Sequence, residues 1–209
     1  GNDTANVKKN RATIQKGLEA GELLFVRQVH GTEILILSQR HDFRPDKPTD
    51  RPPVGDALIT NVSGSFLVVQ VADCQPVFLY DSTRKVVANV HSGWRGSIRN
   101  IIGRTIDAMG REFGTVPRDI VAAIGPSLGP CCAEFIHYRD EIPKMFWSYK
   151  DSDHHFDFWA ISRDQLTDAG VPAAHIFSSE TCTRCNPELF FTYRGEGTTG
   201  RFAAVIGLI

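Results

Sequence analysis

The sequence predicts a single α/β (α+β) domain with mixed β-sheets. About ten short apolar or β-branched runs are separated by turn residues, but only three or four segments have helical periodicity. Strands therefore outnumber helices too heavily for simple βαβ winding. A chain of 209 residues is long enough to bury a large core, so it needs no disulfides or structural metal to fold. We expect one domain over residues 1–209, because no internal repeat or low-complexity tract divides the chain.

Composition excludes several classes of protein. The net charge is −1 with acids and bases interspersed, so we expect no nucleic-acid surface, which needs a basic stripe. We expect no membrane span, because no apolar stretch reaches ~20 residues, and the first residues carry no signal-peptide core. Five cysteines without a compact framework indicate a reducing compartment. We expect a cytoplasmic protein that is monomeric or weakly homo-oligomeric.

The first half of the chain reads mostly as strands. A short helix is predicted over residues 3–18, with Asp3 or Thr4 as its cap and Gly17 or Gly21 as its end. A surface loop rich in proline and aspartate is predicted over residues 41–54. Apolar and β-branched content predicts strands over residues 23–29, 34–37, 56–60 and 66–71 and a hairpin of residues 76–80 and 85–90.

The second half contains the clearest helix. It follows Ser97 as N-cap and stops at Gly114, with apolar residues on one 3.6-period face. A second amphipathic helix over residues 158–169 ends before Gly170. A third covers residues 140–147 with Pro143 in its first turn. Strands are predicted over residues 120–124, 131–136 and 176–178, and a hairpin over residues 190–193 and 202–208.

Three soft-metal ligands occupy equivalent places in this pattern. His30, Cys74 and His91 each stand at the downstream end of a predicted strand. Strand ends on one edge of a sheet lie close in space, so these side chains can converge. Imidazole and thiolate together favour zinc, and three protein ligands leave a position for a water whose pKa zinc lowers to about 7. Asp73 adjoins one ligand and is a candidate for orienting it or moving protons.

The turn over residues 92–96 suggests an anion site. Gly93 allows close approach of a ligand to the backbone, and the following helix offers free N–H groups. Arg95 adds a guanidinium suited to phosphate or carboxylate. The alternative is a tight strand-to-helix turn with Trp94 as a packing anchor. The glycine-rich loop over residues 194–201 is predicted to be a hairpin tip, and the alternative is that Arg194 or Arg201 reaches an active-site rim.

The other cysteines give a weaker signal. Cys182 and Cys185 have C-x-x-C spacing, typical of zinc or of a redox pair, but a structural zinc needs two more ligands. Cys131 and Cys132 are adjacent, and adjacent residues rarely both reach one tetrahedral ion. The sequence therefore favours buried or loop thiols at these positions.

Several motifs in fixed order resemble the YfiH-like family, often labelled laccase-domain or polyphenol oxidase proteins. They are QVHG (28–31), GDALIT (55–60), ADCQPVFLYD (72–81), HSGWRG (91–96), IGPSLGPCC (124–132) and TYRGEGTTGR (192–201). The resemblance runs over the whole chain. Family members usually carry a further strand and a Gly-rich, Ser-containing segment ahead of the region matching residues 1–10, so substrate contacts supplied there are not assigned.

The resemblance implies a four-layer α/β/β/α arrangement related to a toxin-type cysteine deamidase, a cysteine-hydrolase-type fold. It implies a catalytic zinc on His30, Cys74 and His91. It also implies phosphorolysis of purine nucleosides (adenosine, inosine, guanosine or 5′-methylthioadenosine) with phosphate, together with adenosine deamination. We add Gln28, Gly93, Arg95 and Arg194 as substrate-binding candidates.

Three alternatives remain open at this point. One is a cysteine hydrolase or amidase, acting for example on peptidoglycan precursors, with Cys74 as nucleophile and His91 as base. Another is a copper phenol oxidase, which we disfavour because the seven histidines include no His-x-His pair. The last is a non-catalytic binding module.

Overall fold

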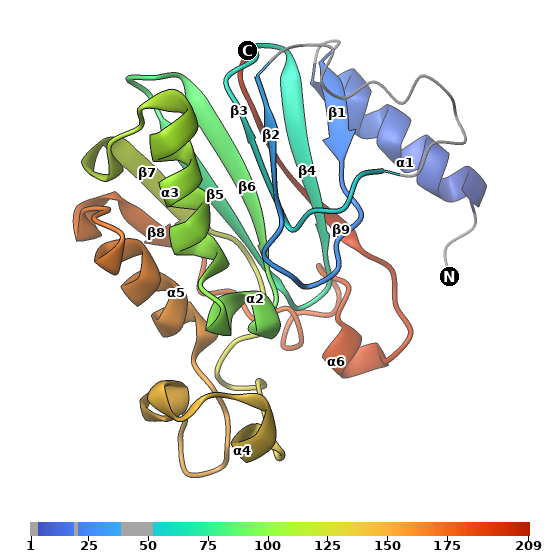
Figure 1. Ribbon diagram of the computed structural model, residues 1–209. Helices are drawn as coiled ribbons and strands as arrows, with labels where there is room; N and C mark the ends of the chain where they lie inside the picture. The colour runs from blue at the N-terminus through green and yellow to red at the C-terminus, as the bar shows by residue number, and fades with distance from the viewer. Residues whose placement is uncertain (1–3, 19–20, 39–51) are drawn as a thin grey trace.

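Two mixed β-sheets form the centre of the computed structural model, which describes residues 4–18, 21–38 and 52–209 (Figure 1). The larger sheet has the order β2-β3-β6-β5-β7-β8 and the smaller one β1-β4-β9. The strands are β1 Glu22–Phe25, β2 Ile34–Leu37, β3 Ala57–Thr60, β4 Ser65–Val71, β5 Gln75–Asp81, β6 Val86–Ser92, β7 Ile120–Ile124, β8 Ile176–Ser178 and β9 Phe202–Gly207. Parallel pairs (β1–β4, β2–β3, β7–β8) occur beside antiparallel ones, so the prediction of mixed sheets is confirmed.

Short helices connect and cover these strands. The α-helices are α1 Thr4–Gly17, α2 Trp94–Ile98, α3 Ile101–Phe113, α4 Tyr138–Glu141, α5 Phe158–Asp168 and α6 Tyr193–Glu196. The 3₁₀ helices are η1 Pro117–Asp119, η2 Lys144–Tyr149 and η3 Ala173–His175. Among the described residues, no helix combines the length and apolarity needed to cross a membrane.

Alternation along the strands explains how the layers pack. In β3, Ala57 and Ile59 join the core under α3, whereas Leu58 joins the core between the two sheets. Side chains of successive strand residues point to opposite faces, so the larger sheet is buried on both. Helices α3 and α5 lie on one face and the smaller sheet on the other (Figure 1). Helix α1 lies beside β1, with Arg11 over the Phe25 ring at 4.1 Å, and its role as a fourth layer stays a prediction.

The core between the sheets makes a stability prediction. Leu58 is fully buried there, so Leu58→Ala should leave a cavity and lower the free energy of unfolding by about 2–5 kcal/mol. Denaturant unfolding measures this loss. Val121→Ala on the half-exposed face of β7 is the control, and a Leu58→Ala loss no larger than that of the control would contradict the packing described.

The central hairpin and the end of helix α3 lie where the sequence predicts them. Strands β5 and β6 form the expected hairpin, and α3 stops at Gly114, whose φ of 69° lies in the left-handed region. The start of α3 was predicted wrongly. Asn100 is its N-cap and accepts from the Gly103 N–H at 3.0 Å. Ser97 instead belongs to the short helix α2, and its hydroxyl pairs with that of Ser92 at 3.0 Å.

Three predicted elements are wrong, and one is shorter than predicted. Residues 131–136 form turns instead of a strand, because Cys132 and Ala133 both donate main-chain hydrogen bonds to the Gly129 carbonyl. The helix predicted over 140–147 splits at Pro143 into α4 and η2, as expected where a proline lacks its N–H. Residues 190–193 do not pair with β9, which pairs with β4. Strand β1 ends at Phe25, earlier than predicted.

Of the other predicted segments, some match the structure and some lie outside the described residues. Helix α5 and strands β7 and β8 match the predicted segments, and Gly170 follows α5 with a φ of 94°. Asp3 and most of the loop predicted over residues 41–54 lie outside the described residues.

Candidate metal centre and pocket

The two sheets meet at the segment that carries Cys74. This residue lies between β4 of the smaller sheet and β5 of the larger one. Strands β5 and β6 are antiparallel with Gln75 opposite Ser92, so the start of one strand lies beside the end of the other. His91, the second-last residue of β6, is therefore beside Cys74. His91 stands at the downstream end of its strand as predicted, but Cys74 lies three residues beyond the end of β4, directly before β5. His30 follows an irregular segment after β1.

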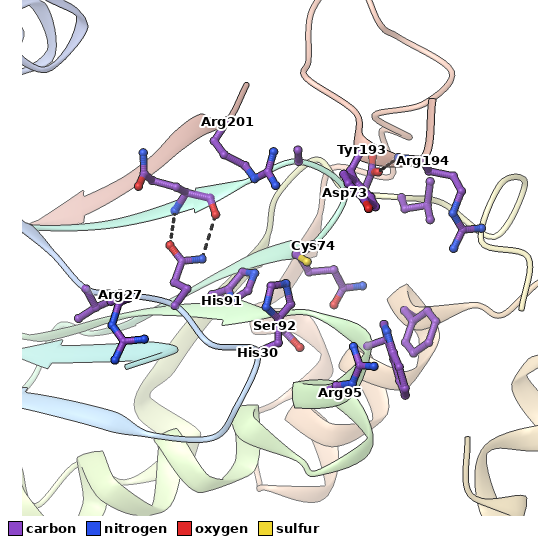
Figure 2. A pocket seen from close by; sticks show the side chains of 18 of the residues that line it. Arg27, His30, Asp73, Cys74, His91, Ser92, Arg95, Tyr193, Arg194 and Arg201 are labelled. Atoms are coloured by element: carbon purple, nitrogen blue, oxygen red, sulfur yellow. Dashed lines mark hydrogen bonds between the residues drawn. The ribbon is translucent and has the colours of Figure 1, made fainter. Parts of the chain in front are cut away.

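The structure brings together all three predicted ligands. The ligand atoms of His30, Cys74 and His91 lie within 4.8 Å of one another, and the two imidazole centroids are 4.9 Å apart (Figure 2). Gly93 completes the arrangement. A Cβ added there would meet His30 Cδ2 at 3.0 Å and Cys74 Sγ at 3.1 Å, so any larger residue would crowd two ligands. His91 is buried and His30 exposed, which leaves the group accessible from one side.

Asp56, which the sequence reasoning missed as a site residue, holds both histidines. Its carboxylate accepts from His91 Nδ1 at 2.8 Å and from the main-chain N–H of His30 at 2.9 Å and Gly31 at 2.8 Å. These bonds stabilise the left-handed backbone of His30, whose φ is 58°. They also engage Nδ1 of His91 and leave its Nε2 for a ligand. A carboxylate behind a histidine is the usual partner of a metal-bound imidazole.

Charge coupling favours a thiolate at this site. Burial raises the pKa of Cys74, but hydrogen bonds and charges from His30 and His91 outweigh burial and lower it to about 6. Burial lowers the pKa of His91, but bonds to Asp56 and Cys74 raise it to about 9. Burial raises the pKa of Asp56, but bonds from His91 and the Gly31 N–H lower it overall. One thiolate and two imidazoles form a donor set that fits zinc. The close approach of the Gly93 backbone to His30 and Cys74 leaves the ligands room to converge.

The low pKa of Cys74 predicts its reactivity in metal-free protein. The thiol is protonated below a pH of about 6 and ionised above it, so alkylation by iodoacetamide should rise with pH through about 6 and level off near neutrality. Site-resolved mass spectrometry measures the rate at Cys74 alone. In Asp56→Asn the midpoint should move upward, since His91 loses the partner that keeps it protonated. A wild-type midpoint near the ordinary thiol value of 9.0 would contradict this coupling.

A cavity of about 670 Å³ opens over the three ligands. Its volume is within the range of small-molecule sites. Four arginines line it from different segments, together with apolar and aromatic side chains and polar ones such as Gln28, Asp73 and Ser92 (Figure 2). The arginines are Arg27, Arg95, Arg194 and Arg201, and the apolar and aromatic residues are Val26, Ala72, Trp94, Leu128, Phe135, Phe158 and Tyr193.

Three other predicted site residues use polar side-chain atoms in hydrogen bonds within the protein. The Gln28 amide donates to the Gln70 carbonyl at 2.9 Å and accepts from its N–H at 2.8 Å, so it fixes the segment ahead of His30. The Asp73 carboxylate accepts from the Thr183 hydroxyl and the Arg194 N–H, both at 2.6 Å. The Arg194 guanidinium donates to the Glu134 carbonyl at 2.8 Å. All three line the cavity, and their roles toward a substrate stay predictions.

The anion site predicted at residues 92–96 keeps only part of its physical basis in the structure. Helix α2 has only five residues, and the N-terminus of α3 is closed by Asn100. Neither helix therefore offers an anion the free N–H groups and dipole of a long helix. The Arg95 guanidinium remains, stacked over the Trp94 ring at 4.2 Å and lining the cavity. Stacking fixes the plane of the guanidinium while its N–H groups stay available.

Fold and site together define a mixed α+β domain with a histidine–cysteine–histidine group in the wall of a polar-rimmed pocket. The chain belongs to the family described as multi-copper polyphenol oxidoreductase laccase, whose sequence model matches residues 1–209. The resemblance to YfiH-like proteins is thereby confirmed.

Named relatives and solved structures agree with this assignment. The chain is 34% identical to the purine nucleoside phosphorylase YlmD of Geobacillus stearothermophilus, over 99% of this chain and 80% of the relative. It is 33% identical to adenosine deaminase RL5 from an unknown prokaryotic organism, over 94% and 79% of the two chains. The crystal structure of YlmD from Geobacillus stearothermophilus superposes with a TM-score of 0.86 at 32% identity, covering 100% of this chain and 82% of that one. The Bacillus licheniformis YfiH structure gives 0.84 at 32% identity, covering 96% and 80%.

Proposed function

We propose that the protein is a zinc-dependent purine nucleoside phosphorylase with adenosine deaminase activity. The observation that carries the proposal is the composition of one cavity. It combines a histidine–cysteine–histidine group, guanidinium groups for an anion and an apolar wall for a base. The names of the relatives support the same reaction class. Substrates of this class are adenosine, inosine, guanosine and 5′-methylthioadenosine.

Each part of the cavity has a role in phosphorolysis. Arg95 binds phosphate, whose oxygen forms a bond to C1′ while the bond from C1′ to the purine nitrogen breaks and the base leaves with the electron pair. Leu128, Phe135 and Phe158 give the base an apolar surface that excludes water. When bound, zinc lowers the pKa of a coordinated water and acts as a Lewis acid. Asp56 keeps His30 and His91 oriented toward one point.

An assay with inosine tests the proposal. Zinc-loaded protein should release hypoxanthine and ribose 1-phosphate only when phosphate is present. Adenosine should be converted to inosine and ammonia without phosphate. Hypoxanthine release that does not depend on phosphate, or no turnover by protein with zinc at His30, Cys74 and His91, would contradict a phosphorylase.

The anion role of Arg95 predicts a specific kinetic change. Arg95→Ala should raise the KM for phosphate about tenfold or more, because a charge-assisted hydrogen bond is worth about 1.5–3 kcal/mol. The KM for inosine should change less. Arg99→Ala is the matched control, an exposed arginine nearby that does not line the cavity. Equal phosphate KM values in the two variants would show that Arg95 does not bind phosphate.

A second candidate rests on a specific observation. Cys74, His91 and Asp56 form a chain of nucleophile, base and orienting carboxylate, as in a cysteine hydrolase or amidase. The two mechanisms respond oppositely to reagents. A chelator should abolish phosphorolysis, whereas a hydrolase should survive the chelator and lose activity to a thiol alkylator.

Copper remains a testable alternative to zinc. The description of the family names copper, and two imidazoles with one thiolate can also hold that metal. We favour zinc because the sequence has no His-x-His pair. Copper at the site together with phenol oxidation would reverse this assignment.

A further inference from the structure

Four cysteines outside the pocket gather at one point. Cys131 and Cys132 come from the segment after β7, and Cys182 and Cys185 from the segment after β8. Their sulfur atoms lie within 4.8 Å of one another. Cys185 Sγ is 3.6 Å from both Cys131 Sγ and Cys132 Sγ. The C-x-x-C pair thus has the two further thiols that the sequence alone did not supply.

The sulfur separations match a shared metal ion. A disulfide needs two sulfurs about 2.05 Å apart, and all four of these cysteines are free. A tetrahedral zinc with Zn–S bonds of about 2.3 Å places its sulfurs about 3.8 Å apart. The observed distances of 3.6 Å are close to that value.

The backbone around the cluster is arranged to present the thiols. Gly129 donates its N–H to Cys182 Sγ at 3.3 Å, the kind of bond that supports a metal thiolate. Its carbonyl accepts from Cys132 and Ala133, which closes the turn that lets two adjacent cysteines reach one point. A Cβ at Gly129 would meet Trp159 Cη2 at 2.8 Å and Cys182 Cβ at 3.1 Å, so this approach needs glycine. The adjacent Cys131 and Cys132 thiols therefore both reach one point, which the sequence alone did not lead us to expect.

We propose that Cys131, Cys132, Cys182 and Cys185 bind a structural zinc ion, separate from the site at His30, Cys74 and His91. Four protein thiolates complete a tetrahedron and leave no position for water, which is the arrangement of a structural site. The thiols lose their protons to solvent when the ion binds.

The proposed ion would brace one wall of the pocket. Thr183, inside the C-x-x-C segment, donates to Asp73 Oδ1 at 2.6 Å, next to Cys74. The Arg194 guanidinium donates to the Cys132 carbonyl at 3.2 Å. Ser127 and Thr183 join the two cysteine segments by a main-chain bond of 3.0 Å. Zinc on the four cysteines would therefore fix the positions of Asp73 and Arg194 without touching substrate.

The decisive experiment uses Cys74→Ser, which removes a ligand of the other site but keeps the cluster. The variant is purified without metal-affinity chromatography, equilibrated with Zn²⁺ and desalted. We expect one zinc per chain, with an X-ray absorption spectrum of four sulfurs at about 2.3 Å. Cys74→Ser/Cys182→Ser/Cys185→Ser is the matched variant and should bind none. Absence of zinc from Cys74→Ser, iron in its place, or a nitrogen-containing ligand shell would overturn the proposal.

A second measurement needs no substitution in the cluster. Cys131 and Cys185 are exposed, so in a metal-free protein they should react quickly with iodoacetamide. In zinc-equilibrated Cys74→Ser we expect both to resist alkylation until a chelator is added. Rapid alkylation before chelation, or a disulfide between any two of the four, would also overturn the proposal. Neither readout depends on enzymatic activity, so the outcome is independent of the phosphorylase proposal.

Discussion

Replacing Cys74 with serine should remove the metal from the pocket and abolish phosphorolysis. Cys74 is the one thiolate of the donor set, and zinc prefers sulfur to a neutral hydroxyl. Loss of a group behind a ligand already costs about 10–100-fold in affinity or activity, so loss of a ligand should cost at least about 100-fold in kcat/KM for inosine. The phosphate-dependent assay measures this directly.

The control for metal loss from the pocket, measured as zinc bound there and not as turnover, is a cysteine outside the pocket. Cys185→Ser should retain zinc on His30, Cys74 and His91, because its thiol belongs to the four-cysteine cluster. Near wild-type turnover by Cys74→Ser would show that a metal at this site takes no part in the reaction. Full activity of wild-type protein in a chelator, combined with loss in Cys74→Ser, would instead favour the cysteine hydrolase.

The second large effect is expected for Asp56→Asn. The fully buried carboxylate accepts from His91 and from three successive N–H groups at Val29, His30 and Gly31. Asparagine keeps one acceptor oxygen but turns an NH₂ toward groups that also donate. Zinc affinity at His30, Cys74 and His91 should fall about 10–100-fold. The free energy of unfolding should fall by about 1–3 kcal/mol, the cost of leaving buried donors unsatisfied.

An equally buried carboxylate at the far end of β5 provides the control. Asp81 caps a turn by accepting from the N–H groups of Thr83 and Arg84 at 2.9 and 3.0 Å. Asp81→Asn should destabilise the fold but leave zinc affinity unchanged. Competition with a chromophoric chelator measures affinity, and denaturant unfolding measures stability. Equal losses of zinc affinity in the two variants would show that Asp56 acts only through stability.

Local pattern was sufficient for the regular part of the fold. The hairpin of β5 and β6, helix α5 and strand β7 carry clear periodicity and turn signals, and they form where expected. The segment around residues 131–156 does not form the predicted strand and helix. Its aromatic residues instead build a separate small core with Phe158. Strand β9 was paired with the wrong neighbour, since its partner β4 is distant in sequence.

The sequence predicts the three candidate metal ligands of the site but not the residues that position them. His30, Cys74 and His91 were identified by residue type and strand position, although two sheets, and not one edge, bring them together. Asp56 was missed because nothing local distinguishes it from a strand-starting aspartate; its role appears only when residues 29–31 fold against it. The four-cysteine cluster was missed for the same reason, because its two pairs are separated by about fifty residues of chain.

The most direct test is an anomalous difference map recorded at the zinc absorption edge from crystals of zinc-equilibrated protein. We expect a peak about 2.3 Å from Cys74 Sγ and about 2.0 Å from one imidazole nitrogen of each of His30 and His91. A well-ordered Cys74 with no peak at that point, under conditions where zinc is bound elsewhere in the chain, would contradict this expectation.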